Sequence, residues 1–116
     1  MAKKYKLLIT GGAGFTPWND HKFSRMKFYY VYVLKSLKDG KNYTGYTENL
    51  RSRFEQHNKG KVASTKHRTP LELIYFEGCI KQNDALKREK YLKTHYGKMF
   101  LKNRLKSYFT GQVGEE

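Results

Sequence analysis

The sequence is poor in cysteine, in acidic residues and in long apolar runs, and each shortage excludes a class of protein. The single cysteine, Cys79, leaves no internal disulfide and no multi-cysteine zinc module, and it fits a reducing compartment. The longest apolar runs span only a handful of residues, so no segment is expected to cross a membrane. The N-terminus lacks the apolar stretch and cleavage site of a secretory signal. We therefore expect a soluble protein of the cytoplasm.

The shortage of acid gives the chain a strong positive charge. Ten acidic residues stand against 24 Lys and Arg, a net charge of +14 on 116 residues, a length that fits one domain. This charge favours a polyanionic partner, nucleic acid before an anionic membrane. Aromatic residues make up 16% of the chain, more than a disordered basic tail would carry, so the chain can form a core. The alternative to a polyanionic partner is a basic domain without a dedicated anion site. No strongly amphipathic apolar face supports a membrane partner.

Residues 1–25 differ from the rest of the chain. A short strand pattern is followed by Gly11, Gly12 and Gly14, as in dinucleotide-binding domains, but Pro17 stands where the third glycine is needed. We expect no dinucleotide, and we interpret this segment as a non-functional leader or fused remnant. The remaining residues hold 19 basic against nine acidic residues, or +10, so most of the charge belongs to a unit that begins at Met26.

From residue 28 onward the pattern predicts a compact α/β unit. Aromatic and β-branched runs indicate strands at 28–34, 42–46 and 71–77, with Lys38-Asp39-Gly40 as a turn. A helix is expected from 48 to 59, with Thr47 as its N-cap and Gly60 as its stop. A second helix, capped by Asn83 or Asp84, runs to about His95 with Gly97 near its end, and a third covers about 98–108. The predicted fold is a three-stranded, mostly antiparallel sheet flanked by helices, in the order β-β-α-β-α-α.

The first predicted helix has an unusual inner face. Leu50, Arg53, Phe54 and His57 follow the i, i+3, i+4, i+7 spacing of one helical face. Because Leu50 and Phe54 should pack on the sheet, Arg53 and His57 would lie near the interior, where a buried arginine needs a partner such as a phosphate. The alternative is that both lie at the rim and extend to water. Periodicity does not decide between these interpretations.

The second predicted helix carries Glu89 among basic neighbours: Lys81, Lys87, Arg88, Lys90 and Lys93. An acid in such surroundings stays ionised and can hold a divalent cation. The alternative, and the better-supported one on this signal alone, is an ordinary i, i+4 pair between Glu89 and Lys93.

Two tyrosines are expected on adjacent strands of the predicted hairpin, Tyr32 and Tyr43. Gly45 leaves backbone open beside Tyr43, which suits close approach by a ligand. Packing in the core or at its rim is the commoner role of a strand tyrosine.

Together these residues resemble the GIY-YIG nuclease superfamily. The resemblance rests on Val31-Tyr32-Val33, on Tyr43-Thr44-Gly45, on Arg53 and His57 in the next helix, and on the later Glu89. It covers about residues 26–108 and is closest to small stand-alone members similar to the nuclease domain of the DNA-repair excinuclease. Accordingly, we expect a nuclease domain at 26–110 and a short tail at 111–116. Both motifs keep their tyrosine and lose other consensus residues, which leaves the general base open.

The resemblance implies a metal-dependent endonuclease that hydrolyses DNA, in repair or recombination. Tyr32 and Tyr43 would flank the scissile phosphate, Arg53 would stabilise its charge, and His57 holds a position where members carry His or Tyr. Glu89 would bind one Mg²⁺ or Mn²⁺, and Asn103 matches a late asparagine that supports the site. A single carboxylate suits one hydrated Mg²⁺. The alternative is a non-catalytic nucleic-acid-binding module that keeps the fold.

Two basic stretches border the predicted site and are expected to contact phosphates. They contribute the candidate nucleic-acid-binding residues Lys59, Lys61, Lys66, Arg68, Lys98 and Lys102. The alternative for any single lysine is that it lies in solvent and contacts no phosphate, which is the more common case. The sequence shows no added DNA-reading domain, so we expect specificity to come from the shape of the DNA or from a protein partner.

Overall fold

The computed structural model describes residues 26–111, which form one sheet and four helices. The strands are β1 (Tyr29–Ser36), β2 (Asn42–Thr47) and β3 (Leu71–Cys79), and the helices are α3 (Leu50–Asn58), α4 (Gln82–Leu92), α5 (His95–Arg104) and α6 (Lys106–Thr110). The predicted leader, residues 1–25, and all but the first residue of the predicted tail lie outside the described residues. None of the four described helices combines the length and apolar character needed to span a membrane.

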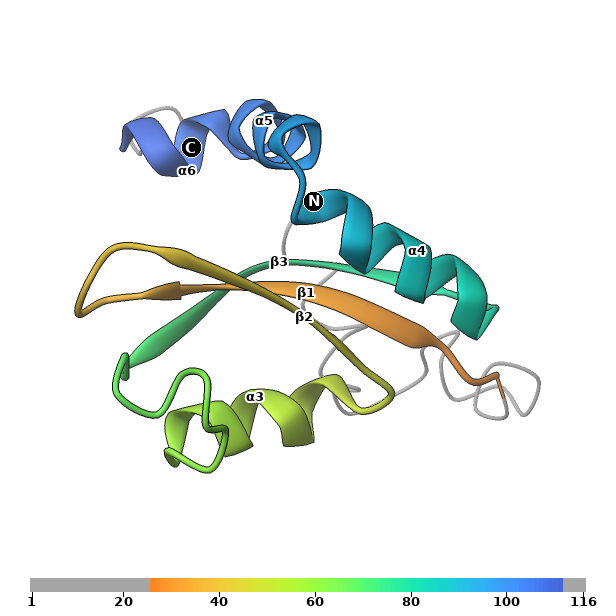
Figure 1. The fold of residues 1–116 in the computed structure, drawn as a ribbon, viewed down its shortest axis with the longest axis horizontal. Coiled ribbons are helices and arrows are strands. Elements are labelled where there is room, and N and C mark those ends of the chain that lie inside the picture. Colours follow the sequence, from red (N-terminus) through yellow and green to blue (C-terminus); the bar gives the residue numbers. More distant parts are fainter. Residues whose placement is uncertain (1–25, 112–116) are drawn as a thin grey trace, which may run out of the picture.

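The sheet has the order β2-β1-β3 and is antiparallel throughout. Helix α3 covers one face of the sheet, and α4, α5 and α6 lie on the opposite face (Figure 1). The predicted α/β fold is confirmed, except that the last predicted helix is divided into α5 and α6.

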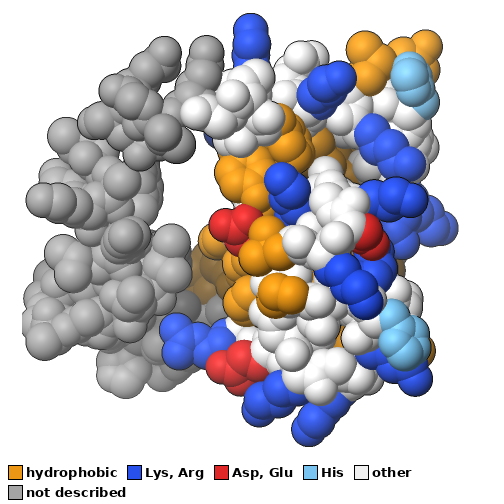
Figure 2. Space-filling view, turned by 90° about the vertical axis from the view of Figure 1, so that its left-hand side faces the viewer, with side chains coloured by type: hydrophobic (Ala, Val, Ile, Leu, Met, Phe, Trp, Pro, Cys, Tyr) orange, Lys and Arg blue, Asp and Glu red, His pale blue; other side chains and the backbone are white. Residues whose placement is uncertain are grey.

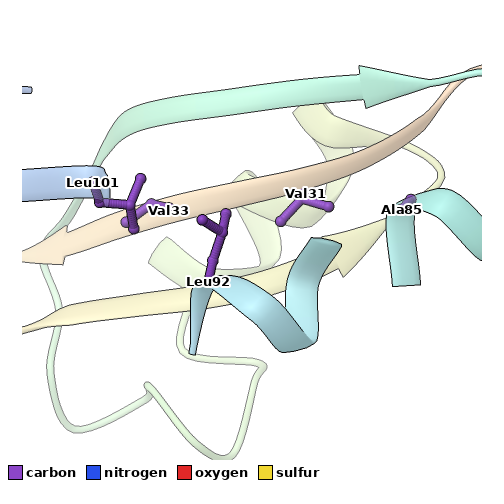
Figure 3. Close-up of a cluster of buried hydrophobic side chains, with 5 residues drawn as sticks. All are labelled: Val31, Val33, Ala85, Leu92 and Leu101. Atoms are coloured by element: carbon purple, nitrogen blue, oxygen red, sulfur yellow. The ribbon is translucent and has the colours of Figure 1, made fainter. Parts of the chain in front are cut away.

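The central strand β1 supplies both hydrophobic clusters because its side chains alternate between the two faces. Toward α4 and α5 lies a cluster of fully or almost fully buried side chains: Val31, Val33, Ala85, Leu92 and Leu101 (Figure 3). Toward α3 lies a second buried cluster, formed by Tyr32, Leu34 and Leu71. The alternation therefore places Tyr32 under α3.

Helix α3 begins two residues later than the sequence predicts. The Asn49 side chain accepts a hydrogen bond from the Ser52 amide at 3.0 Å and is the N-cap, so the prediction of Thr47 as the cap is wrong. Thr47 is instead the last residue of β2, where it pairs with Tyr30, and its hydroxyl bonds to Asn49. Pairing in the sheet takes precedence over local capping preference at this position.

The predicted ends of the second helix are also wrong. Helix α4 has Lys81 at its N-cap, without a side-chain capping bond, and it ends at Leu92. Thr94 then caps α5 by accepting a hydrogen bond from the Gly97 amide at 3.1 Å, so Gly97 lies in the first turn of α5. Strand β3 continues through Gly78, which pairs with Tyr30, instead of ending there.

Candidate active site

His57 is the centre of a chain of buried hydrogen bonds beneath α3. Its Nε2 lies 2.8 Å from the Tyr32 hydroxyl, and its Nδ1 lies 2.7 Å from the Thr65 hydroxyl. Tyr32 is 1% exposed and the other two residues are fully buried. Of the two interpretations that periodicity left open, burial is the correct one for His57. The imidazole uses both nitrogens and cannot turn without breaking a bond.

Thr65 comes from the loop between α3 and β3, and the surrounding bonds fix that loop. The Ser36 hydroxyl donates to the Arg68 carbonyl at 2.6 Å, and the Asn58 side chain bonds both the amide and the carbonyl of Leu71. Sequence reasoning missed Thr65, because an irregular polar loop has no periodicity that would show which residue turns inward.

Arg53 lies one turn before His57 and is half-buried. Its Nη1 donates to the Gln56 side chain at 3.1 Å, and its guanidinium lies near enough to the Tyr32 hydroxyl to stabilise a negative charge there. Gln56 was also missed, although its i+3 spacing from Arg53 was a usable signal. Arg53 is therefore held at the edge of the buried hydrogen-bonded group, where its positive charge acts on Tyr32.

Gly45 makes room for Tyr32. The two residues are opposite each other in the β1–β2 register, and a Cβ at Gly45 would lie 2.5 Å from Cζ of Tyr32. Our interpretation that Gly45 leaves space for a ligand is therefore wrong, since the Tyr32 ring fills that space. The glycine in Tyr43-Thr44-Gly45 serves to pack one motif tyrosine beside the other strand.

Tyr43 completes an aromatic group with Tyr32 and His57. Its ring centroid lies 5.1 Å from that of His57 and 6.4 Å from that of Tyr32. Unlike Tyr32, it is only half-buried. Tyr43 is thus the motif tyrosine with a surface open to solvent.

Burial and charge set the protonation of this group. Burial, with a further contribution from the Arg53 charge, lowers the pKa of His57 from 6.5 to about 4, so the imidazole is neutral at pH 7. Burial raises the pKa of the Tyr32 hydroxyl, and Arg53 opposes that rise. The neighbouring Tyr43 and the carboxylate of Glu89 raise the Tyr32 pKa further.

Glu89 reaches this group from the other side of the sheet. Its side chain on α4 is mostly buried, and its charge acts on the Tyr32 hydroxyl. It forms the i, i+4 ion pair with Lys93 that the sequence also allows. The neighbouring Arg88 makes a two-pronged ion pair with Glu77 instead. Glu89 therefore acts on Tyr32 from α4 while its carboxylate is paired with the Lys93 ammonium.

The residues present fit a metal ion that needs one protein carboxylate. Among residues 26–111, no group of three or more His, Cys, Asp and Glu side chains is placed to enclose a metal. Mg²⁺ often takes one or two carboxylates and completes its shell with water and substrate phosphate. The mostly buried Glu89 carboxylate could supply that one protein ligand, in competition with the Lys93 ammonium.

The remaining predicted site residues lie outside the series of buried hydrogen bonds through His57. Asn103 is exposed on α5, and within the described part of the chain its side chain makes no hydrogen bond to Tyr32, Arg53 or His57. Arg68 is tied to the β1–β2 turn, where its Nε donates to Asp39 at 2.9 Å. The other predicted phosphate contacts are exposed, and the last two of them line a groove beside Tyr43: Lys59, Lys61, Lys66, Lys98 and Lys102.

A comparison with known families identifies the domain that carries this geometry. Residues 28–106 match the GIY-YIG catalytic domain, which is most of the chain and includes every residue of the buried group. The chain belongs to the GIY-YIG family. Membership implies a nuclease-type function, and nucleases of this family generally use a divalent metal.

Relatives of the chain within the GIY-YIG family are small bacterial proteins. It is 42% identical over 78 residues to a UPF0213 protein of Staphylococcus epidermidis, a match that covers 66% of this chain and 94% of the relative. A UPF0213 protein of Staphylococcus aureus is 42% identical over 71 residues, which covers 60% of this chain and 85% of the relative. These names state no activity. No solved structure matches the chain.

The neutral His57 of this GIY-YIG domain predicts a loss of stability in acid. Its pKa is about 4 in the folded chain against an ordinary 6.5, so between these values the unfolded chain binds a proton that the folded chain does not. The free energy of unfolding should therefore be highest above pH 6.5 and fall toward pH 4, by about 3 kcal/mol from this group.

Urea unfolding at pH 7 and pH 4 tests this expectation in the wild type and in His57→Gln. The glutamine variant should lose less stability between the two pH values, by the contribution of His57. The exposed His67→Gln variant is the control and should behave as the wild type does. Equal losses in the wild type and in His57→Gln would contradict the prediction.

Proposed function

We propose that this protein is a metal-dependent endonuclease that hydrolyses phosphodiester bonds in DNA. The observation that carries the proposal is that the charges of Arg53 and Glu89 both act on one tyrosine. The two charges come from helices on opposite faces of the sheet, and both act on the Tyr32 hydroxyl. If Arg53 and Glu89 served only as a structural salt bridge, their charged groups would contact each other. Instead both act on the Tyr32 hydroxyl, and Glu89 pairs with Lys93.

Phosphodiester hydrolysis needs positive charge around the phosphoryl oxygens, an activated water and help for the leaving oxygen. Arg53 is suited to the first task because its planar guanidinium can bind two phosphoryl oxygens at once. Gln56 holds one end of that guanidinium in place. Glu89 would hold the Mg²⁺ or Mn²⁺, which when bound supplies further positive charge and lowers the pKa of a bound water.

The two tyrosines are proposed to have different roles, because their exposure differs. Tyr43 is half-buried and can contact a bound phosphate directly, whereas Tyr32 is only 1% exposed. The Tyr32 hydroxyl joins His57 through a 2.8 Å hydrogen bond. The neutral imidazole can therefore accept a hydrogen bond from the Tyr32 hydroxyl when Nδ1 carries the ring hydrogen and donates it to Thr65, which orients that hydroxyl.

The exposed basic residues and Asn103 are proposed to support the substrate. The loop that carries Thr65 also holds or adjoins Lys59, Lys61 and Lys66. Phosphates bound by these lysines would therefore be close to the buried hydrogen bonds of His57. Repair or recombination of DNA is the proposed setting, by similarity to the nuclease domain of the DNA-repair excinuclease.

Cleavage of supercoiled plasmid in the presence of Mg²⁺ tests the proposal. We expect nicking by the wild type and a loss of at least about 100-fold in Glu89→Gln, because the neutral amide is a much weaker ligand for Mg²⁺. Glu55→Gln removes the same charge from an exposed position on α3 and should leave the rate unchanged. Branched DNA and RNA of matched sequence show which nucleic acid is preferred.

One outcome separates the proposal from its alternative. The Lys93 ammonium already neutralises Glu89, which is the one feature that favours a binding module without catalysis. If wild type, Glu89→Gln and Glu55→Gln give the same background with Mg²⁺ and with Mn²⁺, while the wild type still binds DNA in a salt-dependent way, the alternative is correct.

A further inference from the structure

A groove with a basic rim and an apolar floor lies beside the candidate active site. The roles proposed for the buried hydrogen bonds of His57 and for Glu89 do not use this groove. It has a volume of about 830 Å³ and lies between β2 on one side and the ends of α4, α5 and α6 on the other. We call it the lysine groove, after the four lysines on its rim: Lys41, Lys93, Lys98 and Lys102.

The lining of the lysine groove combines two chemistries. Besides the four lysines, the described residues that line it include no acidic side chain, so it attracts anions. Its apolar part consists of Leu92, Leu101 and Phe109, of which the two leucines belong to the buried cluster of Figure 3. Figure 2 looks at this end of the molecule and shows Lys and Arg side chains among exposed hydrophobic ones. A groove that bound only a sugar–phosphate backbone would need the lysines without the apolar floor.

The lysine groove shares two residues with the candidate active site. Tyr43 lines the groove and also lies against His57, with a centroid distance of 5.1 Å. Lys93 lines the groove and forms the ion pair with Glu89. A chain of nucleotides that enters the groove would therefore reach Tyr43 and Glu89 within the same binding event.

From this combination we infer that the lysine groove binds an unpaired nucleotide next to the scissile phosphate, so that the substrate is single-stranded at that point. The inference rests on the proposed nuclease function and specifies its substrate. The lysines contact the phosphates, and the base lies on the apolar floor with Phe109 as a stacking partner. A duplex has no free base face to place on the floor, because its bases are paired and stacked.

Binding without cleavage tests the inference. Fluorescence anisotropy in EDTA compares labelled single-stranded oligonucleotides, of DNA and of RNA, with the same sequence closed into a duplex. We expect the single strand to bind at least about ten-fold more tightly than the duplex, since stacking on Phe109 is open only to an unpaired base. The DNA and RNA arms show which sugar the groove accepts.

Two sets of variants assign the effect to the lysine groove. Phe109→Leu keeps an apolar floor and removes the aromatic face, so it should weaken single-strand binding about five-fold or more and leave duplex binding unchanged. Replacing Lys98 and Lys102 together by glutamine should reduce the slope of log affinity against log salt by about 1.4 for single strands. Replacing the exposed Lys87 and Lys90 of α4 in the same way is the charge-matched control.

The results separate this inference from the proposed function. If the duplex binds as tightly as the single strand, or if Phe109→Leu weakens both equally, the groove does not hold an unpaired base and the inference is overturned, even where plasmid is cleaved. If the single strand binds as expected and no substrate is cleaved in any metal, the groove still holds an unpaired nucleotide, but the proposed endonuclease activity is wrong and no phosphate beside it is cleaved.

Discussion

Replacing Arg53 with alanine is expected to lower the rate of DNA cleavage by roughly 10²–10³-fold, the cost of removing one preorganised charge or donor from a transition state. The Arg53 guanidinium opposes the rise in the pKa of the Tyr32 hydroxyl, and its Nη1 donates to the Gln56 side chain, which helps to orient it. Because its side chain is half-buried at the edge of the cluster, its removal opens little of the core. Cleavage should therefore fall much more than stability.

Arg51 provides a matched control for this experiment. It lies on the same helix, is exposed and carries the same charge, so Arg51→Ala should cleave at nearly the wild-type rate. Arg53→Lys keeps the charge but loses the planar pair of donors, and it should restore only a small part of the activity. Equal rates for Arg51→Ala and Arg53→Ala would show that Arg53 contributes only to the general charge.

A second measurement on Arg53→Ala does not depend on cleavage. The Arg53 charge is one cause of the lowered pKa of His57, after burial. Its removal should therefore raise the pKa of the imidazole above about 4 in an NMR titration, while Arg51→Ala leaves it unchanged. An unchanged titration in Arg53→Ala would mean that the guanidinium does not lie beside this group in solution.

Replacing Gly97 with alanine is expected to cause the largest loss of stability, about 3 kcal/mol or more. A Cβ at this position would lie 2.5 Å from the Cα of Leu92 and 2.7 Å from the carbonyl carbon of Tyr91. Both are backbone atoms, which cannot turn away as the end of a side chain could. Helix α5 would have to move off the end of α4, and the buried contact of Leu92 with Leu101 would be disturbed.

Gly78→Ala is the control for the cost of the substitution itself. At Gly78 a Cβ would meet only side-chain atoms, the nearest 3.4 Å away in Tyr30, so the loss should be below about 1 kcal/mol. Thermal unfolding measures both variants, and a loss of 3 kcal/mol corresponds to a melting temperature at least about 12 °C lower for a domain of this size. Similar melting temperatures for the two alanine variants would contradict the predicted clash.

Strand identity and helix identity were predictable, whereas several ends were not. The aromatic and β-branched run that begins at residue 28 predicts β1 because its composition fits a strand that is covered on both faces. Its actual end at Ser36 depends on pairing with Leu71, far along the chain. In the same way, Thr47 has the side chain of an N-cap but is used by β2, so the helix begins after Asn49.

The candidate site was predictable only where its residues follow a period or a motif. Helical spacing placed Arg53 and His57 on the inner face, and the strand motifs gave Tyr32 and Tyr43. Thr65 and the role of Gly45 were not accessible, because each depends on a contact across the fold: a loop that folds onto His57, and a ring from β1 that lies on β2. The i, i+4 pair of Glu89 with Lys93 was predictable, but its position near Tyr32 was not.

By itself, the sequence determined the positive charge, the α/β order of elements and the family to which the chain belongs, because these depend on composition, periodicity and spaced motifs. Only the tertiary structure decided that His57 is buried and neutral, that Tyr32 is buried while Tyr43 is half-exposed, and that the lysines of α5 border an apolar groove. The physical reason is that burial and pKa are set by atoms brought together from α3, the following loop and both faces of the sheet, and no local pattern records which of these atoms meet.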